Sequence, residues 1–179
     1  SMPRTIKVKL IRNEFPATYR YSLWLRIFKL LFAFAVCLYA FYFVVKFVSA
    51  ETPMFFKVLP LIILFIALDG MFKQLMVLNR VTFYEDRVCF GFIAKPRLII
   101  PYENILYIDL VKQITYSIIL KYKEGNREKI FKTSASFPKI LEIILNLADL
   151  APNAQSSEFF GKIIKHLRTL AGENDAEQV

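Results

Sequence analysis

The sequence predicts an α+β membrane protein, with an N-terminal hairpin of two transmembrane helices followed by a strongly bent antiparallel sheet or barrel that a C-terminal helix closes. Three observations lead to this fold class. Two apolar runs of membrane-spanning length lie within the first 78 residues. After Asn79 the apolar residues alternate with polar ones, which is the period of a strand, and after Ser136 they recur every three or four residues, which is the period of a helix.

The first apolar run is long enough to cross a bilayer. Leu30 to Val45 contains no charged residue, and extension to residues 27–48 takes in Lys29 and Lys46 near the two ends. A helix over these residues would be about 33 Å long, against about 30 Å of hydrocarbon. Lysines near the ends of a span can extend their ammonium groups to the interface. We therefore expect the first span over about residues 27–48.

A second apolar run covers residues 54–76 and follows a turn at residues 49–53. So short a connection forces the two helices to lie antiparallel as a hairpin, residues 27–78. Pro60 falls in the first turns of the second helix, where its missing N–H costs less than at mid-span.

Basic residues indicate the orientation of the hairpin. Residues 1–78 carry ten basic and three acidic side chains, most of the basic ones in the leader, residues 1–26, whereas residues 79–179 carry fourteen and twelve. The positive-inside rule then places both termini in the cytoplasm. Candidate membrane-interface residues are Tyr19, Arg20, Tyr21, Trp24, Arg26, Lys29, Asp69 and Lys73.

Asp69 is the only acid within or near a span. An intramembrane acid is a functional candidate by default. Lys73 follows four residues later, so the two side chains can form an ion pair on one helix face. We expect this interfacial ion pair and keep a functional or subunit-contact role as the alternative.

The alternation after Asn79 predicts six short strands. They cover residues 81–83, 88–92, 97–100, 105–111, 116–122 and 128–132. Turns are expected at residues 85–86, 95–96 and 124–126. A further alternation at residues 6–10 could add an edge strand to the sheet.

Two amphipathic helices are expected after the strands. The first opens at Ser136 or Phe137, has Pro138 in its first turn and ends before Pro152. The second begins at about Ser156, in a C-terminal segment, residues 153–179, that ends in a frayed tail. The second helix can pack on the sheet domain, lie on the membrane or contact a partner.

Three features of residues 80–150 occur together. They are a strand–turn–strand opening, one glycine in the second strand (Gly91), and the run Ile-Pro-Tyr-Glu-Asn-Ile from Ile100 to Ile105. In this combination the segment resembles the bacterial pleckstrin-homology-like (PH-like) domains that occur beside transmembrane hairpins. The resemblance implies a PH-like domain over residues 79–152, anchored in the bacterial inner (cytoplasmic) membrane. It also implies a scaffold that binds proteins, peptides or lipids and has no catalytic residues.

Basic residues in the strands are candidates for binding a lipid or a partner. They are Lys95, Arg97, Lys121, Lys123, Arg127, Lys129 and Lys132. Alternation places Lys121 with Lys123, and Arg127 with Lys129, on common faces. With Glu124 and Glu128 mixed in, this is either a solvated sheet face or a surface that rests on anionic headgroups. The acidic turn Glu85-Asp86 argues against inositol-phosphate capture between the first two strands, because that mode needs a basic cluster there.

No set of residues for catalysis or metal binding can be assembled. Two cysteines and one histidine are too few for a zinc site, and phosphate-cradling glycine loops are absent from the sequence. Cys37 falls in a span and Cys89 in a strand, and His166 is expected on a solvated helix face. We therefore expect no enzymatic activity and no cofactor, and the placement of the charge in the leader argues against nucleic-acid binding.

These expectations combine into a non-enzymatic inner-membrane protein whose PH-like domain is a protein- or lipid-binding scaffold at the cytoplasmic face. Tethering raises the local concentration of the domain at the membrane, so weak contacts suffice. The expected partners are anionic lipid headgroups and a protein partner or a second copy of the chain. The alternative is an integral accessory subunit of a transporter or secretion-type complex, whose working interface is the hairpin.

Overall fold

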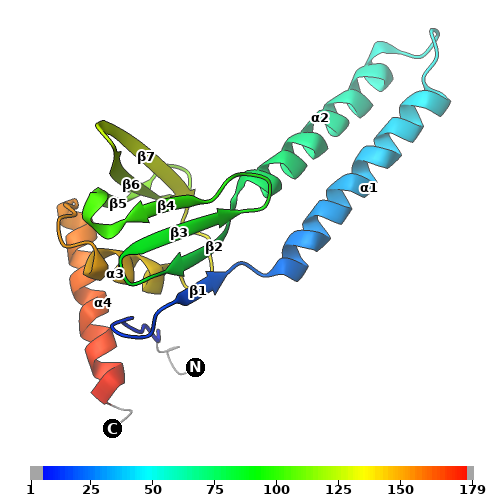
Figure 1. The fold of residues 1–179 in the computed structure, drawn as a ribbon. Helices are drawn as coiled ribbons and strands as arrows, with labels where there is room; N and C mark the ends of the chain where they lie inside the picture. The colour runs from blue at the N-terminus through cyan, green and yellow to red at the C-terminus, as the bar shows by residue number, and fades with distance from the viewer. Residues whose placement is uncertain (1–5, 177–179) are drawn as a thin grey trace. The chain divides into compact units, whose positions relative to one another are not determined.

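The computed structural model describes residues 6–176. The frayed tail is predicted from Glu173 to Val179, but the C-terminal helix continues to Ala176, and residues 177–179 lie outside the described residues. The chain divides into two compact units (Figure 1). The first, here called the sheet unit, contains the described residues up to Arg20, residues 80–91 and the residues from Arg97 onward. The second, the hairpin unit, contains residues 21–79 and 92–96.

The hairpin unit consists of two long antiparallel helices, α1 (Leu23–Phe47) and α2 (Met54–Met76). The bounds of α2 match the predicted second span, whereas α1 begins four residues before the predicted 27, because the Ser22 hydroxyl accepts a hydrogen bond from Leu25 N (3.5 Å) and caps the helix there. The helices meet at small or compact residues, since Cys37, Ala40 and Pro60 are buried. At the turn, Ser49 N donates to Thr52 Oγ1 (2.8 Å) and Lys57 Nζ to Ala50 O (3.0 Å).

Both helices are long and apolar enough to cross a membrane. In the most apolar 18-residue window of α1 only 6% of the residues are buried, and in that of α2 only 11%. A core helix of a water-soluble protein would be mostly buried instead. The large side chains of the hairpin point outward, with Trp24 84% exposed and Phe65 72% exposed.

Seven strands form two antiparallel sheets. The first sheet has the order β1-β2-β3-β4 and the second the order β5-β6-β7. The strands are β1 (Ala17–Arg20), β2 (Leu78–Phe83), β3 (Arg87–Phe92), β4 (Leu98–Pro101), β5 (Ile105–Lys112), β6 (Tyr116–Glu124) and β7 (Arg127–Ser134). A short 3-10 turn, η1 (Tyr102–Asn104), joins them. All six predicted strands and the turns at Glu85-Asp86 and residues 124–126 are present, with Gly125 adopting the left-handed φ of 61° that its turn requires.

The first strand was not predicted. β1 pairs with β2 in the register Ala17↔Phe83 to Arg20↔Arg80, so the chain leaves this sheet at Arg20 for the hairpin unit and returns to it at Arg80. The edge strand expected at residues 6–10 is wrong, because those residues form no strand. The backbone N–H and carbonyl of Lys9 bond to side chains of a helix instead, as described below.

The core of the sheet unit lies between the two sheets and two C-terminal helices, α3 (Ile140–Leu150) and α4 (Glu158–Ala176). Its fully buried side chains include Val81, Phe83, Ile100, Ile105, Ile108, Leu120, Ile144, Leu145 and Phe160. In β6 they alternate with more exposed residues, as the sequence pattern predicts, whereas residues 81–83 of β2 and 88–91 of β3 are buried without a break.

The start of α3 differs from the prediction. Residues 135–139 form turns, and the helix begins at Ile140, so Pro138 precedes it. Lys139, the residue before the helix, has a left-handed backbone with φ 53° and cannot be a helical residue. Helix α4 contacts α3 and β5 and buries Phe160, Ile164, Leu167 and Ala171, which decides among the three predicted placements in favour of packing on the sheet unit.

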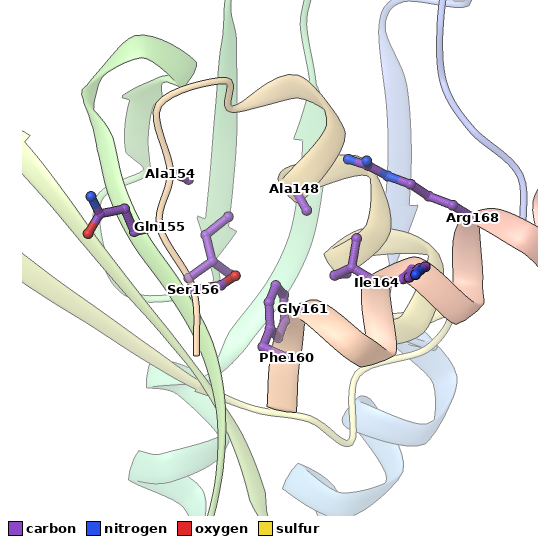
Figure 2. Close-up of a pocket in the computed structure, with 10 residues that line it drawn as sticks. Ala148, Ala154, Gln155, Ser156, Phe160, Gly161, Ile164 and Arg168 are labelled. Carbon is purple, nitrogen blue, oxygen red and sulfur yellow. The ribbon is translucent and has the colours of Figure 1, made fainter. Parts of the chain in front are cut away.

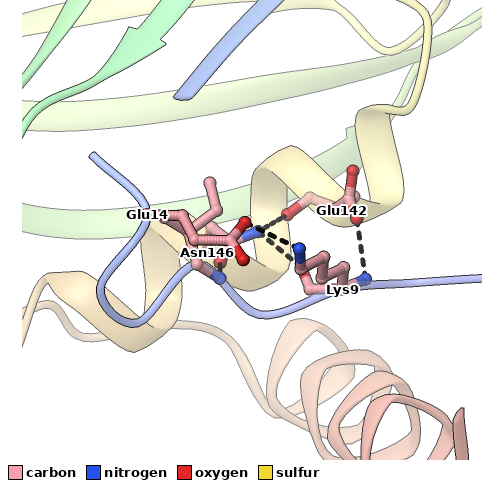
Figure 3. A network of polar contacts seen from close by, with 5 residues as sticks. Lys9, Glu14, Glu142 and Asn146 are labelled. Atoms are coloured by element: carbon pink, nitrogen blue, oxygen red, sulfur yellow. Dashed lines mark hydrogen bonds and ion pairs between the residues drawn. The ribbon is translucent and has the colours of Figure 1, made fainter. Parts of the chain in front are cut away.

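The leader segment before β1 is fixed to α3 by the buried amide of Asn146 (Figure 3). Asn146 Nδ2 donates to the carbonyls of Lys9 (3.0 Å) and Glu142 (2.8 Å), and its Oδ1 accepts from Ile11 N (2.6 Å). Lys9 N donates to the Glu142 carboxylate (2.7 Å), and Lys9 Nζ pairs with Glu14 (2.6 Å). Val8 and Ile11 are buried, so the segment is part of the core.

Replacement of Asn146 should release the leader segment. Asn146→Ala leaves Ile11 N–H and the Lys9 carbonyl without their partner, which costs about 2 kcal/mol of the free energy of unfolding. Amide hydrogen exchange of residues 8–11 in detergent-solubilised protein should accelerate strongly. Asn153→Ala, at an exposed position of the α3–α4 connection, is the control and should leave exchange unchanged. Equal exchange in the two variants would contradict this role of Asn146.

Two tyrosines should make the sheet unit sensitive to alkaline pH. Burial raises the pKa of Tyr19 and of Tyr102 well above the ordinary value of about 10, with the negative charges of Glu142 and Asp86 adding to the effect. Between the unfolded and folded pKa values only the unfolded chain releases these protons, so the contribution of the two tyrosines to the free energy of unfolding is constant below about pH 10 and falls as the pH rises further.

Each such tyrosine contributes up to about 1.4 kcal/mol per pH unit to that fall. Tyr102→Phe loses the hydrogen bond to Tyr84 O (2.6 Å) and starts from a lower stability, but its decline above pH 10 should be shallower than that of the unchanged protein. Denaturant unfolding at several pH values in this range measures both slopes, and identical slopes would contradict the assignment.

Candidate functional site

The basic residues predicted to bind a lipid or partner do not form one surface. In the β6–β7 register Lys121 faces Ile130, Lys123 faces Glu128 and Ile119 faces Lys132, so Lys121, Lys123 and Lys132 share the outer face. Arg127 and Lys129 lie on the opposite face, across from Glu124 and the buried Tyr122. The two pairs recognised by alternation are thus real, but each belongs to a different side of the sheet.

Carboxylates neutralise part of this basic cluster. Lys129 forms an ion pair and hydrogen bond with Glu124, which raises the pKa of its ammonium group. Lys123 faces Glu128 across the hairpin. Lys121 lies over the ring of Tyr107, 5.2 Å from its centroid, and Lys132 Nζ donates to Gln113 Oε1 (3.1 Å). Lys121 and Lys132 are therefore the members of the outer face without a carboxylate partner across the strand pair.

Lys95 and Arg97 are not part of the β6–β7 hairpin. Both are exposed in the connection between β3 and β4. Lys95 belongs to the hairpin unit and lies 4.8 Å from the centroid of the Phe92 ring, whereas Arg97 belongs to the sheet unit.

The candidate membrane-interface residues divide between the two units. Tyr19 and Arg20 belong to β1, where Tyr19 packs edge-on against Phe83 and Arg20 faces Arg80. In the hairpin unit, Trp24 is exposed and Lys29 Nζ lies 3.4 Å from the hydroxyl of Tyr21. The predicted ion pair between Asp69 and Lys73 forms, with an N–O distance of 2.9 Å.

Arg26 has a different environment from its neighbours, because it is almost fully buried at the base of the hairpin. Its guanidinium donates to the carbonyls of Val77 (3.3 Å) and Leu78 (3.0 Å), which follow the end of α2, and stacks on the ring of Tyr21 at 4.6 Å. A helix leaves its last carbonyls without intrahelical partners, and a cation at that end also meets the negative pole of the helix. Arg26 thus joins the start of α1 to the end of α2.

A pocket of about 390 Å³ lies between β5, α3, α4 and the segment that joins the two helices (Figure 2). Its apolar lining includes Ile108, Phe160 and Ile164, and Lys165 and Arg168 supply two cations. One side of the pocket is formed by Gln155, whose backbone is hydrogen-bonded to β5. Ile108 N donates to Gln155 O, and Gln155 N donates to Leu106 O (2.9 Å each). Arg168 also lies 3.9 Å from Asp149.

A polar network beside this pocket was not recognised in the sequence. The Asp109 carboxylate accepts hydrogen bonds from Tyr107 Oη (2.8 Å) and Ser157 Oγ (2.6 Å). The bond to Asp109 raises the pKa of the Tyr107 phenol. Ser157 Oγ in turn accepts from Phe160 N (3.2 Å) at the first turn of α4. The available signal was Ser157 immediately before an apolar-periodic segment, which is the pattern of a helix cap.

The residues that the structure describes contain no group of three or more His, Cys, Asp or Glu side chains that could hold a metal ion. Cys37 and Cys89 are both buried, in α1 and β3, and His166 is exposed on α4. The described residues therefore provide surfaces for binding. These are a pocket lined by apolar side chains and two cations, and the exposed lysines on the outer face of a sheet.

No protein-family model and no curated protein matches the chain.

Removal of the Arg26 guanidinium should loosen the base of the hairpin. Arg26→Met leaves the carbonyls of Val77 and Leu78 without their donor, at a cost of about 2–4 kcal/mol for the two groups. Thermal unfolding in detergent should therefore begin at a clearly lower temperature. Arg20→Met, which removes an exposed arginine six residues earlier, is the matched control. If both variants unfold at the same temperature, Arg26 does not hold the hairpin together.

Proposed function

We propose that the protein is a non-enzymatic, membrane-anchored binding module, in which the hairpin spans the bacterial inner membrane and a PH-like sheet unit binds a protein or lipid surface at its cytoplasmic face. The observation that carries the proposal is the position of the hairpin in the chain. Both of its ends connect to neighbouring strands of one sheet, at Arg20 and Arg80, which face each other in the β1–β2 register. The hairpin is therefore an apolar insertion between two paired strands of the domain that it anchors.

The surface of the hairpin supports a spanning role. Large apolar side chains remain exposed along both helices, and burying them in hydrocarbon removes that surface from water. The charged residues Lys29, Lys46 and Lys57 lie toward the helix ends, and the Asp69–Lys73 pair lies in the last two turns of α2. The uncharged stretch is about 24 Å long in α1, residues 30–45, and about 17 Å in α2, residues 58–68, so a hydrocarbon core of about 30 Å requires the lysines to extend to the interface and Asp69 to stay paired with Lys73. The basic leader supports cytoplasmic termini.

The sheet unit supports a binding role. Two antiparallel sheets followed by helices that close the core agree with the fold that the PH-like resemblance implies. A domain held at the membrane by two spans meets membrane ligands at a high effective concentration, so shallow surfaces with modest affinity are sufficient. The outer face with Lys121, Lys123 and Lys132 and the pocket beside α4 are the surfaces proposed for this contact.

One observation favours the alternative of an accessory subunit in a membrane complex. An apolar groove of about 520 Å³ runs along the hairpin and is lined by Phe32, Ala35, Val36, Tyr39, Ala40, Phe43, Leu59, Pro60 and Ile63. Small residues at a membrane helix surface allow another helix to approach closely. Purification in mild detergent separates the two functions, because a subunit should retain a stoichiometric integral membrane partner.

Fractionation tests the anchoring of the full chain. We expect the protein to stay with the membrane pellet after an alkaline carbonate wash, since two spans hold it by burial of apolar surface. A C-terminal tag should resist protease added to intact cells and be cleaved in inverted membrane vesicles. Release into the carbonate supernatant, or cleavage of the tag from outside intact cells, would contradict the proposed function.

A further inference from the structure

The most exposed large apolar side chain in the described part of the protein is Ile114, which is 96% exposed at the tip of the β5–β6 hairpin. The tip is ordered by hydrogen bonds on both sides of this residue. Gln113 N donates to Thr115 O (3.2 Å), and Lys132 Nζ donates to the side chain of Gln113 (3.1 Å). Ile114 is therefore exposed to solvent on a turn whose conformation is fixed by hydrogen bonds.

Apolar surface continues from this tip toward the start of α3. A groove of about 530 Å³ is lined by Leu110, Tyr116, Ile140 and Leu141 among others. A second hollow, of about 250 Å³, is lined by Ile6, Phe137, Lys139 and again Ile140 and Leu141. The shared residues make the two hollows neighbours, so the leader segment, the start of α3 and the β5–β6 tip contribute to one surface of the sheet unit.

Cations without carboxylate partners surround this surface. Lys7, Lys112 and Lys139 are exposed, and none of them forms an ion pair in the structure described for residues 6–176. Lys112 lies over the ring of Tyr116, 5.5 Å from its centroid. Glu142 also lines this surface, and its carboxylate accepts a hydrogen bond from Lys9 N. On the β6–β7 cluster, in contrast, Glu124 and Glu128 offset part of the charge.

Lys139 is also held in a strained backbone conformation. Its φ of 53° is the only positive value at a non-glycine residue among those described. Glycine or asparagine would adopt this conformation at lower cost. A strained residue that persists on a surface can indicate a functional requirement for its side chain. Here the side chain is one of the three unpaired lysines.

We infer that the surface formed by Ile6, Lys7, Lys112, Ile114, Tyr116 and Lys139, here called the tip surface, docks on the anionic face of the bilayer that anchors the protein. The inference rests on the proposed function and names the ligand of the sheet unit as the lipid surface. An apolar residue at the acyl boundary, a tyrosine at headgroup level and lysines among anionic headgroups are the elements of an interfacial contact. Ile114 protrudes from its surface, and fluid lipid can surround a protruding side chain without a preformed pocket.

An environment-sensitive fluorophore at residue 114 tests the contact in the full chain. The buried Cys37 and Cys89 are first replaced by alanine, and Ile114→Cys is labelled with a nitrobenzoxadiazole dye. Asn126→Cys, at the exposed tip of the β6–β7 hairpin, is the matched label position. Both proteins are reconstituted into nanodiscs of phosphatidylglycerol with phosphatidylcholine, and of phosphatidylcholine alone.

We expect a blue shift and increased emission at residue 114 in the anionic discs, reversed by high salt, and no such change at residue 126. Absence of a response at residue 114 in protein that has entered the discs overturns the inference and leaves the anchoring function intact. A response at residue 126 alone, or an equal response at both tips, also overturns it. Failure of the chain to enter nanodiscs at all would instead count against the proposed spanning hairpin.

Charge neutralisation gives a second test, in which the substitutions lie outside the labelled position 114. A lysine near an anionic bilayer contributes roughly a fivefold factor in binding, so Lys112→Gln with Lys139→Gln should lower the docked-to-undocked ratio roughly 30-fold. The label at residue 114 reports this ratio. Arg127→Gln with Lys129→Gln removes the same charge from the opposite face of the β6–β7 hairpin, outside the surfaces proposed for binding, and should leave the ratio within about twofold. Equal losses in both double variants would mean that the tip surface has no special role.

Discussion

The antiparallel pairing of β1 with β2 is the constraint on which the rest of the fold depends. Residues 17–20 face residues 83–80, and the chain between them leaves the sheet, forms two long helices and returns to the neighbouring strand. The entropic cost of closing a loop grows slowly with its length, and this loop is itself ordered by the contact of α1 with α2. Near its two ends Arg26 bonds to the carbonyls of Val77 and Leu78.

In the sheet unit, α3 is the most deeply buried helix, and several other segments pack against it. Five consecutive residues of α3, Ile143 to Leu147, are buried. A helix that packs on a sheet with one face only would bury a single stripe of residues, so α3 must be covered on more than one side. The sheets, α4 and the leader segment together cover the helix, and the buried Asn146 is tolerated because its amide bonds to Lys9 and Ile11 of the leader segment and to Glu142 of its own helix. The leader segment therefore completes the cover over α3.

Local patterns in the sequence predicted the two long helices, six strands and the Asp69–Lys73 pair, because each depends on residues close in the chain. The strand β1 was missed because four residues carry little pattern and their partner lies beyond the hairpin. Helix α3 starts later than predicted because Lys139 has a left-handed backbone conformation. This conformation is rare for lysine, so no signal in the sequence predicts it. Of the candidate site, alternation found the paired lysines, but the division of Lys121 and Lys129 between two faces depends on the β6–β7 register.

The position of the hairpin also determines how the protein would respond to cleavage. The two helices lie in the segment of residues 21–79, which two backbone connections, after Arg20 and before Arg80, join to strands of the sheet unit. A nick in the exposed turn at residues 49–53 leaves each helix covalently attached to a strand of the same sheet, and a nick at either connection leaves the other intact. Shedding the sheet unit in a soluble form therefore requires two proteolytic events, whereas one suffices for a domain that hangs from a single tail.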